Sequence, residues 1–361
     1  MPVRFRKQFV SEERFESAGA WDVDNDGHVD IVSGGYWYPG PDFRTRCPIG
    51  EIPAVADYYD DFTTIPMDIN GNGYVDFVAG GWFSETVQWR ENPMGQRDTP
   101  WTLHDVGHVG NIETTRAWDI DGDGDLEIIP SLPDGPVDVF KLVRDADGRG
   151  TGEFVRHRIW DGPQRHGLGF GDIAGNGRAD IIMTNGWLEA PAKPFDEPWI
   201  FHEEFDVGEA SVPIIVADVT GNGLSDLIVG QAHDYGLHWW EQGRDDAGER
   251  TWTRRIIDPF NSQYHDMQWV DIDGDGACEL VTGKRYRAHG GMDPGSADPV
   301  GLYYFKWTGE GFSKQVIDYG PAGTGCGCGL HFAVADLTGD GRLDIVAPGK
   351  DGLYVYFNEG E

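Results

Sequence analysis

The sequence predicts an all-β protein, a seven-bladed β-propeller built from four-stranded blades. Three observations support this fold class. An acidic nine-residue loop occurs seven times, short apolar runs typical of strands border each copy, and the 361 residues include 52 Gly with 14 Trp, 13 Tyr and 18 Phe. Abundant Gly together with many aromatic residues favours short strands joined by tight turns.

The repeated loop has an acid at its first position, Gly at its sixth and Asp or Glu at its ninth. Its seven copies lie 46 to 65 residues apart and begin at Asp22, Asp68, Asp119, Asp172, Asp218, Asp271 and Asp336. Recurrence at this spacing indicates one structural unit per copy, repeated around a common centre.

Strand-like runs accompany each loop. Residues 181–183 directly follow one loop, residues 237–240 form a third run after the next, and residues 252–256 form a fourth. Four strands in a unit of about fifty residues are typical of a propeller blade, so seven units predict seven blades.

The last copy leaves room for only three strands before the chain ends. The N-terminal run of residues 5–10 is similar to the outer runs, for example residues 312–317. We therefore expect it to complete the seventh blade and to close the ring, which leaves no open sheet edge. Residues 1–361 are then expected to form a single propeller domain.

Charge and composition exclude several functional classes. The chain has 28 Lys and Arg against 62 Asp and Glu, a formal net charge of −34, which argues against nucleic acid and anionic membranes as partners. No apolar stretch is long enough for a transmembrane helix. Basic residues near the N-terminus are not followed by an apolar segment, so we expect no signal peptide. The compartment remains unknown, with the cytoplasm favoured, and the oligomeric state stays open.

The acidic loops and the strands before them, such as residues 214–217, resemble FG-GAP/VCBS repeats, the calcium-loop units of certain seven-bladed propellers. The resemblance extends over nearly the whole chain. It implies the propeller fold, but these propellers serve adhesion, binding and catalysis alike.

Four loops carry enough oxygen ligands at alternate positions to wrap Ca²⁺. We expect structural calcium there, held by Asp22, Asp24, Asp26, Asp30, Asp68, Asn70, Asn72, Asp76, Asp119, Asp121, Asp123, Glu127, Asp271, Asp273, Asp275 and Glu279. The other three loops have Ala174, Thr220 or Thr338 at the third position, and hydrogen bonds from Asp to the backbone could hold them instead.

A second candidate site lies at the central axis. The residue six positions before each loop should face a shared funnel, and in chain order these residues are Glu16, Phe62, Glu113, His166, Val212, His265 and Leu330. Glu16, Glu113, His166 and His265 could bind a second divalent cation, Zn²⁺ or Mn²⁺. They could equally act as general acid and base, or simply bond to neighbouring backbone and water.

Loops on the same face combine aromatic and cationic residues, which suits a carbohydrate. The residues expected to contact it are Tyr36, Trp37, Trp82, Trp187, His233, Lys284, His289 and His331. Packing between blades is the alternative for each Trp. Cys326 and Cys328 are close in sequence, but buried free thiols are more common than a metal site in such a pair.

The chain also resembles, more distantly, rhamnogalacturonan-type lyases and the propeller domain of aldos-2-ulose dehydratase. In the latter, a His before the acidic loop looks like His265 here, although this chain lacks that enzyme's cupin domains. The resemblance implies a carbohydrate lyase or dehydratase acting by β-elimination. His166, His265 or Tyr286 would remove a proton while Arg285 or a metal stabilises the enolate.

Two alternatives remain open at this point. One is a non-catalytic module that binds a glycan or a protein through the aromatic face. The other is a purely structural propeller within a larger assembly.

Overall fold

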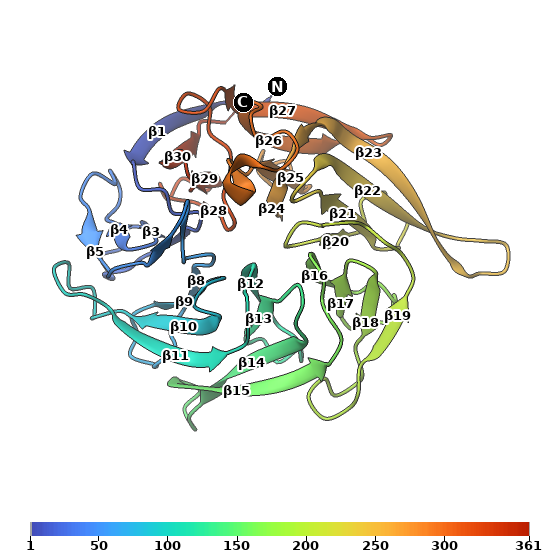
Figure 1. Cartoon of the computed structure of the whole chain (residues 1–361), viewed down its shortest axis with the longest axis horizontal. Coiled ribbons are helices and arrows are strands. Elements are labelled where there is room, and N and C mark those ends of the chain that lie inside the picture. The colour runs from blue at the N-terminus through green and yellow to red at the C-terminus, as the bar shows by residue number, and fades with distance from the viewer. Residues whose placement is uncertain (1, 361) are drawn as a thin grey trace.

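The computed structural model describes residues 2–360 and shows strands arranged in a ring around a central axis (Figure 1). Seven four-stranded antiparallel sheets form the blades. The predicted fold class is therefore confirmed. Within the described part of the chain, no helix is long and apolar enough to cross a membrane.

The strands of each blade run from the axis outward in chain order, except in the last blade. The first three blades consist of β2 (Gly19–Trp21), β3 (Asp30–Ser33), β4 (Tyr36–Tyr38) and β5 (Cys47–Pro48); β8 (Ile65–Met67), β9 (Asp76–Gly80), β10 (Thr86–Glu91) and β11 (Thr102–His108); and β12 (Thr114–Trp118), β13 (Glu127–Ser131), β14 (Val137–Arg144) and β15 (Gly150–Trp160). The next three consist of β16 (Leu168–Gly171), β17 (Asp180–Met183), β18 (Gly186–Glu189) and β19 (Ile200–Glu203); β20 (Ile215–Ala217), β21 (Asp226–Gly230), β22 (Tyr235–Arg244) and β23 (Arg250–Ser262); and β24 (Tyr264–Val270), β25 (Glu279–Lys284), β26 (Val300–Trp307) and β27 (Phe312–Gly320).

The seventh blade joins the two ends of the chain. It contains β28 (Ala333–Ala335), β29 (Asp344–Ala347), β30 (Leu353–Asn358) and, as its outer strand, β1 (Phe5–Ser11). β1 pairs antiparallel with β30, with Phe5 opposite Asn358, and the two strands lie side by side near both termini (Figure 1). The predicted closure of the ring is confirmed, and it gives the last blade its fourth strand.

Packing between neighbouring blades explains why the second strand of each blade is a continuous apolar run. Seven clusters of buried residues lie between adjacent blades. Because successive side chains of a strand point to opposite faces, Ile181 packs toward the third blade and Ile182 toward the fifth. Ile31 and Val32 divide in the same way between the seventh and second blades. Each blade is therefore buried on both faces, and the core of the ring consists of seven clusters, one between each pair of neighbouring blades.

The acidic loops connect the first and second strands of each blade and share one internal geometry. The first Asp accepts hydrogen bonds from the amides of the fifth and sixth residues in every copy, as Asp119 does from Asp123 (3.1 Å) and Gly124 (3.0 Å). The sixth residue has a positive φ, 93° at Gly124, a conformation that Gly adopts without strain. Hydrogen bonds to the backbone thus shape all seven loops, whether or not the third position is acidic.

Two insertions extend the face opposite the acidic loops. A short hairpin of β6 (Ala54–Val55) and β7 (Tyr58–Tyr59) lies between the first two blades. The segment 285–299, with the 3₁₀ turn η1 (Ala288–Gly291), connects β25 to β26. We call this surface the cavity face, because it carries the cavities described next.

Candidate functional site

The cavity face contains a hollow of about 650 Å³ near the axis of the ring. Loops from four blades and the 285–299 insertion contribute to its wall, which is formed by Trp82, Glu113, Pro133, Asp134, Pro163, Arg165, His166, Thr184, Asp206, Gly208, Glu209, His233 and His289. Its charged residues include four carboxylates and a single Arg. The hollow therefore favours a cationic or neutral ligand group over an anion.

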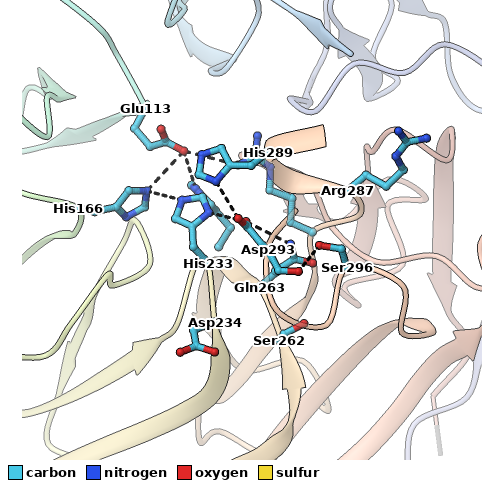
Figure 2. Close-up of polar contacts among 12 residues, drawn as sticks. Glu113, His166, His233, Asp234, Ser262, Gln263, Arg287, His289, Asp293 and Ser296 are labelled. Atoms are coloured by element: carbon cyan, nitrogen blue, oxygen red, sulfur yellow. Dashed lines mark hydrogen bonds and ion pairs between the residues drawn. The ribbon is translucent and has the colours of Figure 1, made fainter. Parts of the chain in front are cut away.

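One carboxylate and three imidazoles converge at the inner end of this hollow, as Figure 2 shows for Glu113, His166 and His233. The Nε2 atoms of His166 and His233 are 3.0 Å apart. His265 Nε2 lies 2.8 Å from Glu113 Oε1, and His166 Nε2 lies 3.5 Å from the same oxygen. Each residue offers one ligand atom, and these four atoms lie within 4.8 Å of one another.

Strand entry positions bring the cluster together. Glu113 directly precedes β12 and His166 lies two residues before β16, so both reach the axis as the chain enters an inner strand. His265 lies near the start of β24, and His233 comes from the loop between β21 and β22. Four blades thus contribute one residue each to a single point.

Burial and mutual hydrogen bonding set the ionisation of the cluster. Burial opposes the charge of Glu113, but hydrogen bonds from His166 and His265 hold its pKa well below the usual range. Burial lowers the pKa of His233 to about 4, and a positive charge on His166 acts in the same direction. Burial also holds the pKa of His265 well below its ordinary value, whereas Glu113 raises the pKa of His166. Glu113 and His166 thus favour each other's charged forms, whereas burial favours neutral His233 and His265.

Glu16 does not belong to this cluster, although its position in the repeat suggested that it would. Its carboxylate accepts a hydrogen bond from Arg285 Nε at 2.8 Å, and Lys350 Nζ lies 3.7 Å away. Both Glu16 and Arg285 are buried. A buried pair of this kind neutralises the guanidinium, so Glu16 is occupied as a counter-ion for Arg285 and is not free as a ligand.

A smaller cavity of about 220 Å³ adjoins the hollow. Four aromatic residues form most of its wall, and two charged groups and a histidine complete it: Tyr58, Phe62, Trp82, Phe83, Glu113, Arg285 and His289. Its aromatic lining can hold one apolar side chain, with Arg285 and Glu113 at its polar end.

Three of the residues predicted to bind a ligand do face these cavities. Trp82 and His289 line both, and His233 lines the larger one. His289 is about half exposed, stacks on His233 with ring centroids 4.3 Å apart, and shares the carboxylate of Asp293 with it.

The structure places other predicted ligand contacts elsewhere. Trp37 is fully buried between the first two blades. Trp187 is buried against the fifth blade, stacks on His202, and donates its Nε1 proton to Glu204 at 2.6 Å. Both side chains are committed to packing between blades, which was the alternative interpretation.

Lys284 was also expected to contact a ligand, but the structure directs its side chain inward. Its ammonium is buried and donates hydrogen bonds to Ser262 Oγ (2.7 Å), Gln263 Oε1 (2.6 Å) and the carbonyl of Gly295 (2.8 Å). Burial lowers its pKa to about 8. Lys284 therefore anchors the 285–299 insertion and does not reach a ligand.

Two remaining residues do not join the cluster. Tyr36 packs near Phe15 and beneath the guanidinium of Arg46. His331 Nδ1 lies 3.3 Å from the Thr64 amide, from which it accepts a hydrogen bond.

The two neighbouring cysteines, Cys326 and Cys328, are buried free thiols, and burial raises the pKa of both.

The acidic loops group carboxylates as the sequence predicts in three of the four richest copies. The groups are Asp22, Asp24 and Asp30; Asp119, Asp121 and Glu127; and Asp271, Asp273 and Glu279. In the last two, a lysine ammonium contacts the same oxygens. Lys141 Nζ lies 2.6 Å from Asp121 and from Asp123, and Lys306 contacts Asp273 and Asp275.

The ninth residue distinguishes the loops further. Where it is Asp, both oxygens accept backbone amides in four of five copies, as Asp30 does from Val23 (2.8 Å) and Gly40 (2.7 Å), whereas Oδ2 of Asp226 has no partner among the described residues. Where it is Glu, Oε1 accepts no backbone amide among the described residues and instead faces a lysine ammonium, Lys141 at 3.1 Å from Glu127 and Lys306 at 3.5 Å from Glu279. Each of these two loops therefore has a buried carboxylate oxygen, paired only with a lysine, that fits a hard cation once the lysine is displaced.

Comparison with known proteins supports the fold. No protein-family model matches the chain, and no curated protein matches it. Two similar solved structures are crystal structures of BBS1N in complex with ARL6DN, one soaked with lead and one with mercury. Both have a TM-score of 0.53 and cover 99% of this chain and 96% and 98% of theirs, at 10% and 11% identity. At such low identity the likeness shows the seven-bladed architecture alone.

The expectation of a carbohydrate lyase is corrected. The solved propellers that match this chain over nearly its full length are described as a complex of one protein with another. Of the residues expected to act in that reaction, His166, His265 and Arg285 lie within 3.6 Å of Glu113 Oε1. Tyr286 lines a separate cavity.

Sequence reasoning missed two parts of this site. From the sequence, His233 was expected only to contact a ligand. The residues expected at the axis were those six positions before each acidic loop, whereas His233 follows the second strand of its blade. Asp293, which accepts from both His233 and His289, lies in an insertion that belongs to one blade alone. A repeat pattern carries no signal for such a residue.

Proposed function

We propose that residues 1–361 act as a single, non-catalytic binding propeller whose cavity face docks a protein partner. The observation that carries this proposal is a set of large apolar side chains exposed on one rim of that face. Phe260 is 82% exposed and Met292 is 84% exposed. Exposed apolar groups of this size, next to a hollow, are typical of protein interaction surfaces.

The exposed residues belong to one connected part of the rim. Phe260 lies near the end of β23 and Tyr235 begins β22, and these two strands pair. The phenol of Tyr235 donates a hydrogen bond to Asp298 in the insertion that carries Met292 (2.6 Å). We call Tyr235, Phe260 and Met292 the rim patch.

Two cavities beside the rim patch indicate the chemistry of the partner. The smaller, aromatic-lined cavity fits one apolar side chain, which would act as an anchor. The carboxylates of the larger hollow favour a basic segment next to that anchor. The likeness to BBS1N, a propeller found in complex with ARL6DN, is consistent with a protein as the ligand class.

Site-specific crosslinking tests this function. A photo-reactive phenylalanine analogue is placed at position 260, and at position 200 as a control, because Ile200 is 58% exposed on the outer strand β19. We expect one protein of the source cell to crosslink from position 260 and not from 200. Binding of that purified protein should weaken about tenfold or more in Phe260→Asp and Met292→Asp and remain unchanged in Ile200→Asp. Equal crosslinking from both positions, or equal binding by all variants, would contradict the proposal.

We also propose that the acidic loops beginning at Asp119 and Asp271 bind structural Ca²⁺, in keeping with their likeness to FG-GAP/VCBS loops. Each combines two aspartates with a glutamate oxygen that faces a lysine ammonium and accepts no backbone amide among the described residues. Calcium prefers several such oxygens, and it would displace the neighbouring lysine ammonium from them.

A further inference from the structure

We propose that Glu113, His166, His233 and His265 form a binding site for one divalent transition metal, with Zn²⁺ favoured over Mn²⁺. The inference goes beyond partner binding, because it assigns a ligand to the axis of the ring itself. Three imidazole nitrogens and one carboxylate oxygen form a donor set that Zn²⁺ commonly takes, whereas an oxygen-rich set would favour Mn²⁺ or Mg²⁺.

The hydrogen bonds around two of the imidazoles fix which nitrogen faces the cluster. His166 Nδ1 lies 2.8 Å from the carbonyl oxygen of Ala210. His233 Nδ1 lies 2.9 Å from a carboxylate oxygen of Asp293. Since both oxygens only accept hydrogen bonds, each Nδ1 must carry a proton.

This arrangement leaves two lone pairs in conflict. With the Nδ1 atoms protonated, neutral His166 and His233 both present bare Nε2 atoms, and these are only 3.0 Å apart. Glu113 Oε1 adds a third acceptor 3.5 Å from His166 Nε2. Three acceptors directed at one point require a shared cation, which is either a proton on one ring or a metal ion.

The surroundings match those of metal-binding histidines. Such histidines donate their outer N–H to a carboxylate or a backbone carbonyl, which orients the ring and raises its basicity. Asp293 and Ala210 provide these two contacts here. His265 differs from these two rings. It is fully buried and contacts Glu113 Oε1 through Nε2, but its Nδ1 has no outer hydrogen-bond partner within residues 2–360.

The positive charge of Arg285, which lies near the cluster, is paired with the carboxylate of Glu16. Arg285 Nη1 lies 3.6 Å from Glu113 Oε1 and would oppose a cation. However, Glu16 accepts the hydrogen bonds of this guanidinium at 2.8 Å and 3.4 Å. Because Glu113, His166 and His233 line the larger hollow, an ion can enter from solvent and keep one open coordination position.

Cobalt binding tests this site, since Co²⁺ takes the place of Zn²⁺ and its visible spectrum reports nitrogen ligation. The full chain is freed of metal and titrated with Co²⁺ and then Zn²⁺ in excess Ca²⁺, which fills the acidic loops. We expect one equivalent of Co²⁺ to give an intense visible band that Zn²⁺ abolishes. His166→Ala and His233→Ala should each lower the affinity about 100-fold or more, and Asp293→Asn about 10- to 100-fold.

The matched control is His202→Ala, because His202 forms a similar pair with Glu189 at 2.9 Å outside the cluster. Circular dichroism confirms that each variant is folded before titration. No cobalt band in the folded wild-type chain would overturn the proposal and assign the cluster to a shared proton. An unchanged band in folded His166→Ala and His233→Ala would also overturn it.

Discussion

The ammonium of Lys141 lies 2.6 Å from Oδ2 of Asp121, within the group of carboxylates where a calcium ion is expected. It also contacts Glu127 at 3.1 Å. A lysine and a metal ion therefore compete for the same oxygens. The side chain supplies one positive charge where Ca²⁺ would supply two.

Lys141→Met should increase the calcium affinity of this loop, on the order of tenfold or more, because the competing ammonium is removed and the carboxylates then repel one another without metal. Without calcium, the variant should melt below the wild type. Calorimetric titration and thermal unfolding with and without Ca²⁺ measure both effects. If Ca²⁺ shifts the melting temperature of neither protein, this loop does not bind calcium.

Because Asp61 must ionise inside the fold, the free energy of unfolding should fall as the pH rises. Asp61 is buried, and burial raises its pKa to about 7 despite the nearby charge of Arg90. The folded state thus binds this proton more tightly than the unfolded state, so its stabilising effect is present below about pH 4 and is lost as the pH rises to 7.

Asp61→Asn removes this titration. Between pH 5 and pH 8, the free energy of unfolding of the wild type should fall relative to the variant by about 2 kcal/mol. Urea unfolding at the two pH values measures the difference. Parallel pH profiles would show that Asp61 stays ionised in the fold.

Trp37 and Phe260 form a contrasting pair for stability. Trp37→Ala should cost about 3–5 kcal/mol, because it removes a fully buried ring between two blades. Phe260→Ala should change stability by less than about 0.5 kcal/mol, because its ring is mostly in solvent. Chemical denaturation of both variants measures the contrast, and a large loss in Phe260→Ala would show that this ring packs in the fold.

Lys284 is expected to hold the 285–299 insertion in place. Lys284→Met removes the donor for two buried oxygens and for the partly buried carbonyl of Gly295, which should cost about 1–3 kcal/mol. Amide exchange in residues 286–299 should accelerate, while exchange in β9 on the far side of the ring stays unchanged. Unaltered exchange in the insertion would mean that its other contacts are sufficient to hold it.

The repeat made the fold predictable from the sequence, whereas the site was only partly predictable. The period located all seven inner strands, and a residue such as Glu113 or His265 could be assigned to the axis from its distance to the next loop. The same reasoning placed Glu16 there, because spacing cannot reveal that Arg285 approaches from 269 residues away and pairs with it. Trp37 and Trp187 were misassigned because an aromatic ring near a loop has the same sequence signal whether it packs between blades or faces solvent.

Hydrogen exchange of the chain, alone and with the crosslinked partner after its purification, tests most directly whether the cavity face is the binding surface. Our account predicts slower exchange in residues 232–235, 258–263 and 286–299 in the complex, and unchanged exchange in the acidic loops of the opposite face. Protection of the acidic loops, with the three cavity-face segments unaffected, would contradict it.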